Sequence, residues 1–106
     1  MKPPYSRVFR MVFSGRDEDR VRKVFTETDA ELREELKPFG RDILLYAAEE
    51  APVRKLDDSF RYHILIKTVV NRNLSEVRDR IYDIWEKRIR HSGINIGIDV
   101  DPYSVN

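Results

Sequence analysis

The chain has 106 residues, a length that fits one domain. Its 20 basic and 19 acidic side chains leave a formal net charge of +1, so nucleic-acid binding would need a local basic patch. The absence of cysteine excludes disulfides and thiolate metal sites. No apolar run approaches the roughly 20 residues of a membrane span, and we expect a cytoplasmic protein.

The first half of the sequence predicts a strand, a helix and a second strand. Apolar residues alternate from Tyr5 to Phe13, and a period of two is typical of a strand. Acidic residues at 17–19 suit the positive end of a helix dipole, and Pro38 ends the predicted helix. The next strand is predicted at Asp42–Ala48. Apolar residues spaced three and four apart form the buried stripe of the helix: Val21, Val24, Phe25, Thr28, Leu32 and Leu36.

The second half predicts a loop, a strand, a helix and a last strand. The loop covers Glu49–Ser59, and the third strand covers Phe60–Val70. Asn73 and Glu76 have the spacing of a capping box, in which each side chain satisfies a backbone N–H at the start of a helix. The last strand is predicted at Ile94–Asp101, with its isoleucines on one side.

The order strand, helix, strand, strand, helix, strand predicts an α+β fold of the ferredoxin-like type. Two helices, each with one apolar stripe, would cover one face of a four-stranded antiparallel sheet. The first and third strands would lie in its centre, and the other face would stay open. We expect one domain over residues 1–106.

Alternation along the central strands predicts which side chains lie on the open face. Arg10, Arg61, His63 and Lys67 fall on it and would form a local basic cluster able to bind a phosphate or a carboxylate. A solvated face, or one covered by another domain, would show the same alternation.

Aromatic residues argue against an RNA-recognition module, which has the same topology. Such modules stack bases on aromatic rings of the open face. Here Phe9, Phe13 and Tyr62 have the opposite parity and should point into the core. The sequence therefore does not predict a stacking platform.

Other candidates for chemistry are less specific. Asp99 and Asp101 are two apart on a strand and could hold a divalent cation or act as an acid–base pair, but no third ligand is evident, so a structural role is favoured. The charged loop around Arg54 and Lys55 is a place where a partner could be met. No phosphate-binding glycine loop and no metal-ligand spacing is present, so we expect no cofactor for this chain.

Three segments, taken in order, resemble the C-terminal domain of the PriA family, the primosomal protein N′ helicases of bacterial replication restart. The first is Pro3–Ser6, and the last is Ile98–Pro102. The middle one is Ala51–Leu56 followed by Phe60–Lys67. Together the segments span almost the whole chain.

The resemblance implies an accessory domain of a longer ATP-dependent 3′-to-5′ DNA helicase, without catalytic activity of its own. ATP, magnesium and zinc would be bound by other domains of that parent. The implied partners are forked or single-stranded DNA, the acidic C-terminal tail of single-stranded DNA-binding protein (SSB), and the helicase and zinc-binding domains of the same parent chain.

In that family, an arginine and a glutamine at the ends of an Arg-aromatic-Arg-x-Gln stretch help to hold the SSB tail. Ser59 and His63 stand at the matching positions here, and the second arginine is retained as Arg61. Loss of the first arginine removes a charge-assisted contact to a carboxylate. Basic residues expected to meet DNA or a partner are Arg10, Arg54, Lys55, Arg61, His63 and Lys67.

Three alternatives remain at this point. A standalone ribosomal or RNA-binding protein of the same topology would be favoured by a strongly basic composition, which this chain lacks. A small-molecule regulatory domain would bind a ligand at a dimer interface between helices, and the polar outer faces of the helices do not favour such an interface. A small enzyme would depend on Asp99 and Asp101.

Overall fold

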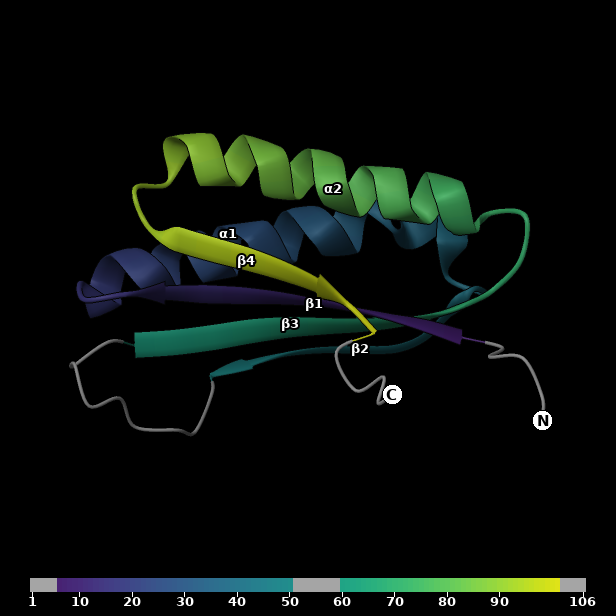
Figure 1. Ribbon diagram of the computed structural model, residues 1–106, viewed down its shortest axis with the longest axis horizontal. Helices are drawn as coiled ribbons and strands as arrows, with labels where there is room; N and C mark the ends of the chain where they lie inside the picture. The colour runs from purple at the N-terminus through teal and green to yellow at the C-terminus, as the bar shows by residue number, and fades with distance from the viewer. Residues whose placement is uncertain (1–5, 51–59, 102–106) are drawn as a thin grey trace.

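The computed structural model describes residues 6–50 and 60–101, which form a four-stranded sheet with two helices on one face (Figure 1). The strands are β1 (Ser6–Gly15), β2 (Ile43–Glu50), β3 (Phe60–Val69) and β4 (Asn95–Val100). The helices are α1 (Glu18–Glu35) and α2 (Leu74–His91), with a short 3-10 helix, η1 (Lys37–Phe39), after α1. The predicted ferredoxin-like order is confirmed.

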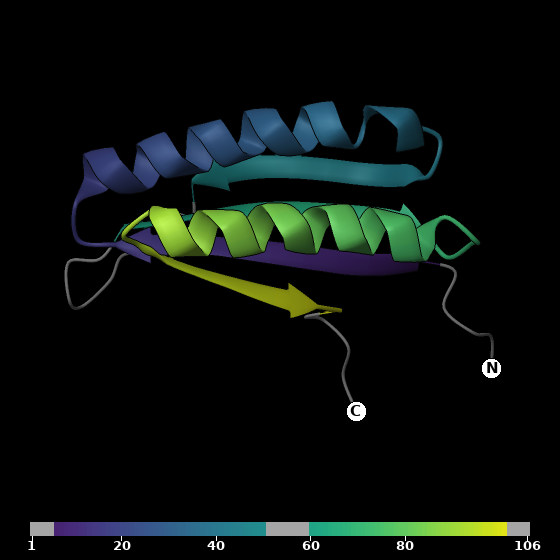
Figure 2. The same ribbon diagram turned by 90° about the horizontal axis from the view of Figure 1, so that it is seen from above.

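The strand order in the sheet is β2-β3-β1-β4, and every neighbouring pair is antiparallel. The central strands are therefore β3 and β1, as the sequence predicts. Both helices run along the strands on the same side of the sheet (Figure 2), so no described element covers the opposite face. Within these residues, no helix is both long and apolar enough to cross a membrane.

The core lies between the sheet and the helices. On each strand, every second side chain points into it. Phe9, Met11 and Phe13 of β1 are buried, as are Tyr62 and Ile64 of β3, so the predicted parity of both central strands is correct. Burial of these large side chains is the main favourable term in folding. From the predicted stripe of α1, Phe25 is only partly buried and packs against the core. The buried residues of the helices are Val21, Val24, Thr28, Leu32 and Leu36 from α1 and its end, and Val77, Ile81 and Ile84 from α2.

Several strand boundaries differ from the prediction by one or two residues. Strand β2 continues through Glu49 and Glu50, where a loop was predicted, and Glu49 lies opposite His63. An edge strand tolerates charged residues because one face is open to water, so their polarity does not end it. Strand β1 likewise extends to Gly15, which pairs with Phe60. Strand β4 begins one residue later than predicted, at Asn95.

The predicted capping box of the second helix is wrong. Asn73 flanks α2 but makes no capping hydrogen bond; its Nδ2 donates to Asp42 Oδ2 at 2.9 Å. Glu76 forms an ion pair with Arg80 at 3.0 Å instead of reaching back. Folding brings the carboxylate of Asp42 to the start of α2, where it binds the asparagine amide more strongly than a neutral acceptor would.

Candidate binding site on the open sheet face

The face opposite the helices carries the described residues of the predicted basic cluster. Arg61, His63, Leu65 and Lys67 are spaced two apart on β3, and Arg10 of β1 lies opposite Leu65. At about 3.3 Å per residue, Arg61 and Lys67 are roughly 20 Å apart along the strand. The sheet therefore arranges these residues as a row along β3 with Arg10 beside it.

Arg10 is not a free cation. It lies opposite Asp99 of β4, and its Nη2 donates to Asp99 Oδ2 at 2.9 Å. A solvent-exposed ion pair of this kind stabilises a fold by no more than about 1 kcal/mol, but it offsets the local charge. Arg10 can therefore attract a phosphate only in competition with a carboxylate already in place.

His63 also has an acidic neighbour. Its Nε2 lies 3.2 Å from Glu49 Oε2 on β2. This contact does not follow from the sequence, in which Glu49 falls in the predicted loop; only the pairing of β2 with β3 brings the two side chains together. Protonation of His63 would therefore form an ion pair within the face.

Arg61 and Lys67 form no ion pair within the described residues. Arg61 is exposed near the end of β1, and Lys67 lies between Val8 of β1 and Leu45 of β2. The open face thus has an apolar and charge-paired centre with one cation towards each end of β3. Arg54, Lys55 and Ser59, which the sequence also assigns to binding, lie outside the described residues.

The two carboxylates of β4 and its end are committed to structural contacts. Asp99 holds Arg10, and Asp101 forms an ion pair with Arg7. Asp101 Oδ1 also accepts a hydrogen bond from the Val8 backbone N–H at 2.9 Å. Within residues 6–50 and 60–101, no three potential metal ligands gather in one place.

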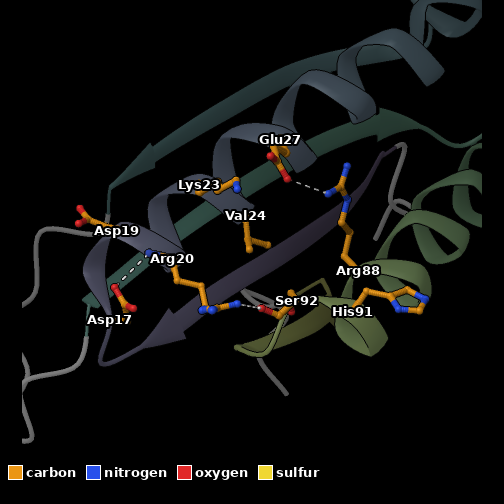
Figure 3. A pocket seen from close by; sticks show the side chains of 9 residues that line it. All are labelled: Asp17, Asp19, Arg20, Lys23, Val24, Glu27, Arg88, His91 and Ser92. Carbon is orange, nitrogen blue, oxygen red and sulfur yellow. Dashed lines mark hydrogen bonds and ion pairs between the residues drawn. The ribbon is translucent and has the colours of Figure 1, made fainter.

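A groove runs between the start of α1 and the end of α2 (Figure 3). Arg88 Nη1 donates to Glu27 Oε1 across it at 3.3 Å, and Arg20 Nη1 donates to Ser92 O at 3.2 Å. Acidic residues in the lining equal lysines and arginines in number, so the groove favours neither an anion nor a cation. Its lining consists of Asp17, Asp19, Arg20, Lys23, Val24, Glu27, Arg88, His91 and Ser92.

Comparison with known protein families matches residues 1–103 to the primosomal protein N C-terminal domain. The chain belongs to this family. The match covers every residue considered above. No curated protein sequence matches the chain.

Solved structures place the primosomal domain among ferredoxin-like folds. A dimeric ferredoxin-like protein from an uncultured marine organism is 9% identical, with a TM-score of 0.60 and coverage of 92% of this chain and 86% of the other. The de novo designed protein Foldit4 is 15% identical, with a TM-score of 0.57 and coverage of 95% and 98%. At such identities the likeness shows the fold alone.

Proposed function

We propose that this domain acts in primosome assembly at restarting replication forks as a binding domain, engaging branched DNA and docking the acidic tail of SSB. Membership of the primosomal protein N C-terminal domain family carries the proposal. The parent would be an ATP-dependent DNA helicase, and its ATP, magnesium and zinc would be bound by other domains of that chain.

The charge distribution on the open face supports the binding role. Arg61 and Lys67 have no acidic partner within the described residues and can meet a phosphate or a carboxylate without first breaking an ion pair. Arg10 and His63 would take part only after their acidic neighbours are displaced. Arg54 and Lys55 add positive charge a few residues before Arg61 in the sequence.

We place the SSB tail at the start of β3, because the family pattern described above supports a contact there. Ser59 cannot pair with a carboxylate as an arginine does, so Arg61 would carry the charge-assisted contact and His63 would donate a further hydrogen bond. We therefore expect tail binding to depend more on Arg61 than on His63.

A standalone RNA-binding protein is the alternative, and it has less support. The described part of the open face carries no Phe, Tyr or Trp, because Phe9, Phe13 and Tyr62 are buried in the core. Base stacking, on which single-stranded RNA recognition depends, would lack its platform.

Fluorescence anisotropy with a labelled forked DNA and a labelled acidic SSB-tail peptide tests the proposal. We expect Arg61→Ala and Lys67→Ala to weaken fork binding and to reduce its salt dependence, because each phosphate contact releases counterions. Lys23→Ala on α1 removes the same charge from the helix side and is the control. Trp85 emission reports folding in the same samples.

Two results would contradict the proposal. If the folded domain binds neither the forked DNA nor the SSB-tail peptide, it does not recognise either ligand on its own. Equal weakening by Lys23→Ala and Lys67→Ala would show that only the overall charge matters, not the open face.

A further inference from the structure

The carboxylate of Asp99 is attached to the rest of the domain only through Arg10. Arg10 Nη2 donates to Asp99 Oδ2 at 2.9 Å, and no other hydrogen bond within the described residues reaches this carboxylate. Asp101 differs, because its carboxylate accepts the Val8 N–H as well as a hydrogen bond from Arg7. The side chain of Asp99 is 51% exposed. Asp99 can therefore rotate away from Arg10 into water, whereas the backbone holds Asp101 in place.

The ion pair leaves the Arg10 guanidinium incompletely satisfied. Arginine has five N–H donors in a planar fork, and Asp99 accepts from Nη2 alone. Arg10 Nε is buried and has no hydrogen-bond partner in the part of the chain that the structure describes. Gly97 lies two residues from Asp99 on the same face of β4, and a Cβ there would meet no atom within 4 Å. The open face therefore has room into which the Asp99 side chain can turn.

Arg10 lies between the two cations of the open face that have no acidic partner in the described residues, Arg61 and Lys67. It is opposite Leu65, which is four residues from Arg61 and two from Lys67. At about 3.3 Å per residue, these steps are roughly 13 Å and 7 Å along β3. DNA carries closely spaced phosphates along its backbone, whereas a single small anion cannot span such distances. A strand bound at Arg61 and Lys67 would therefore bring a phosphate close to Arg10.

Such a strand competes with Asp99 better than a free anion does. Asp99 is held opposite Arg10 by the pairing of β4 with β1, so its effective concentration there is on the order of millimolar or more. A single phosphate or carboxylate at a much lower concentration must displace Asp99 unaided. A phosphate of a strand anchored on both sides of Arg10 is tethered as well, so its effective concentration is comparable with that of Asp99.

We propose that Asp99 is an internal competitor that makes Arg10 selective for the phosphates of a DNA strand over single anions. In the free protein, Asp99 occupies Arg10. A strand anchored at Arg61 and Lys67 displaces Asp99, which turns into the room beside Gly97. Asp99 is thus a specificity-determining residue that does not itself hold the ligand. This inference rests on the proposed function, because it takes DNA as a ligand of the open face.

The affinity of the full chain for a labelled forked DNA, measured by anisotropy, tests the role of Asp99. We expect Asp99→Asn to bind the fork up to about fivefold more tightly, because a weak exposed ion pair no longer has to be broken. Asp99→Ser removes the carboxylate with a smaller side chain and should have the same effect. Trp85 emission reports folding of each variant.

The salt dependence of fork binding gives a second readout. In the wild type, a phosphate that binds Arg10 releases a counterion, but the displaced Asp99 takes up another, so this contact adds little to the salt dependence. In Asp99→Asn the release is not offset. The plot of log K against log salt concentration should therefore become steeper by about 0.7–0.9, the value of one phosphate contact.

Two variants separate the contact from the loss of a negative charge. Asp19→Asn is the matched control, because Asp19 is also an exposed aspartate paired with an arginine, Arg22 on α1, at 2.8 Å. It should give only the small gain in affinity that the change in overall charge causes, without a steeper salt dependence. Arg10→Gln/Asp99→Asn should lose the gain of Asp99→Asn, because the cation that Asp99 releases is absent.

Inorganic phosphate tests the displacement of Asp99 without DNA. Followed through the NMR signal of the Arg10 Nε–H, Asp99→Asn should respond to phosphate at a concentration up to about fivefold lower than the wild type does. An equal response of the two proteins would overturn the inference. If the wild type does not bind the fork, the proposed function is contradicted, and the phosphate titration still decides whether Asp99 competes for Arg10.

Three results with DNA or peptide would also overturn the inference. The first is an equal gain in fork affinity for Asp99→Asn and Asp19→Asn, and the second is a gain that persists in Arg10→Gln/Asp99→Asn. The third is tighter binding of the SSB-tail peptide, and not of the fork, by Asp99→Asn, because Arg10 would then serve the peptide.

Discussion

Val8 and Asp101 join the first and last strands by a reciprocal pair of hydrogen bonds. The Val8 N–H donates to Asp101 Oδ1 at 2.9 Å, and the Asp101 N–H donates to the Val8 carbonyl at 2.6 Å. Asp101 has a φ of 53°, in the left-handed region that aspartate tolerates better than most residues. The side chain of Arg7 completes the contact. One residue therefore ends β4 and fixes the start of β1.

The contact between Val8 and Asp101 should make the free energy of unfolding depend on pH in the acid range. The Val8 N–H, helped by Arg7, lowers the pKa of Asp101 although partial burial opposes the shift. The pKa of an aspartate in an unfolded chain is near 3.9. As the pH decreases through this value, the unfolded chain takes up a proton before the folded one does. The free energy of unfolding therefore decreases until the pH is below the folded pKa as well. We expect Asp101→Asn, which tolerates the same φ, to flatten this acid limb in urea unfolding from about pH 5 to about pH 2. Asp99→Asn controls for the loss of a carboxylate, and an unchanged acid limb in Asp101→Asn would refute the assignment.

Two buried threonines should respond oppositely to the same substitution. Thr28 and Thr68 are both fully buried. The Thr28 hydroxyl has no hydrogen-bond partner in the described residues, whereas Thr68 Oγ1 donates to the Asp42 carbonyl at 3.0 Å. Valine has nearly the same shape, so Thr28→Val should stabilise the fold by about 1 kcal/mol and Thr68→Val should destabilise it by a similar amount. Thermal unfolding measures both, and a loss in Thr28→Val would mean that its hydroxyl has a partner.

Two glycines provide a test of packing. A Cβ at Gly15 would lie 2.9 Å from Val21 Cγ2, and Val21 is completely buried. A Cβ at Gly97 would have no atom within 4 Å. Gly15→Ala should therefore cost about 1–3 kcal/mol through overpacking, whereas Gly97→Ala on the open face should be tolerated. Urea unfolding compares them, and adding Val21→Ala should reduce the incremental cost of Gly15→Ala. Equal effects of the two alanines would exclude the steric explanation.

The contact between Asn73 and Asp42 predicts non-additive variants. If the amide of Asn73 acts through Asp42 and not as a helix cap, the double variant Asp42→Ala/Asn73→Ala should lose less stability than the sum of the single variants. A cycle that pairs Asn73→Ala with Glu76→Ala should be additive. Additivity in the first cycle and non-additivity in the second would show that Asn73 and Glu76 form a capping box after all.

Local patterns predicted most of the fold, and long-range contacts account for what they missed. Alternation in β1 and β3 predicted the buried side of Phe9 and Tyr62 correctly because the pleat depends only on neighbours in sequence. The partner of Asn73 is 31 residues away, and that of Arg10 is 89 residues away. Neither can be read from spacing. The basic cluster was predicted from residue types on one face, but which cations stay unpaired depends on the register of all four strands.

The hydrogen bonds between Asp101 and Val8 also determine how the domain responds to a pulling force. Strand β1 starts beside the point where β4 ends, with Phe9 opposite Val100. Tension applied through residues 6 and 101 therefore acts along the hydrogen bonds of an antiparallel pair, which lie perpendicular to the strands. The bonds would open one after another from this end, as in a zipper, and not rupture together as in a sheet pulled along its strands. We expect force spectroscopy to show that the domain yields at low force when it is pulled through residues 6 and 101.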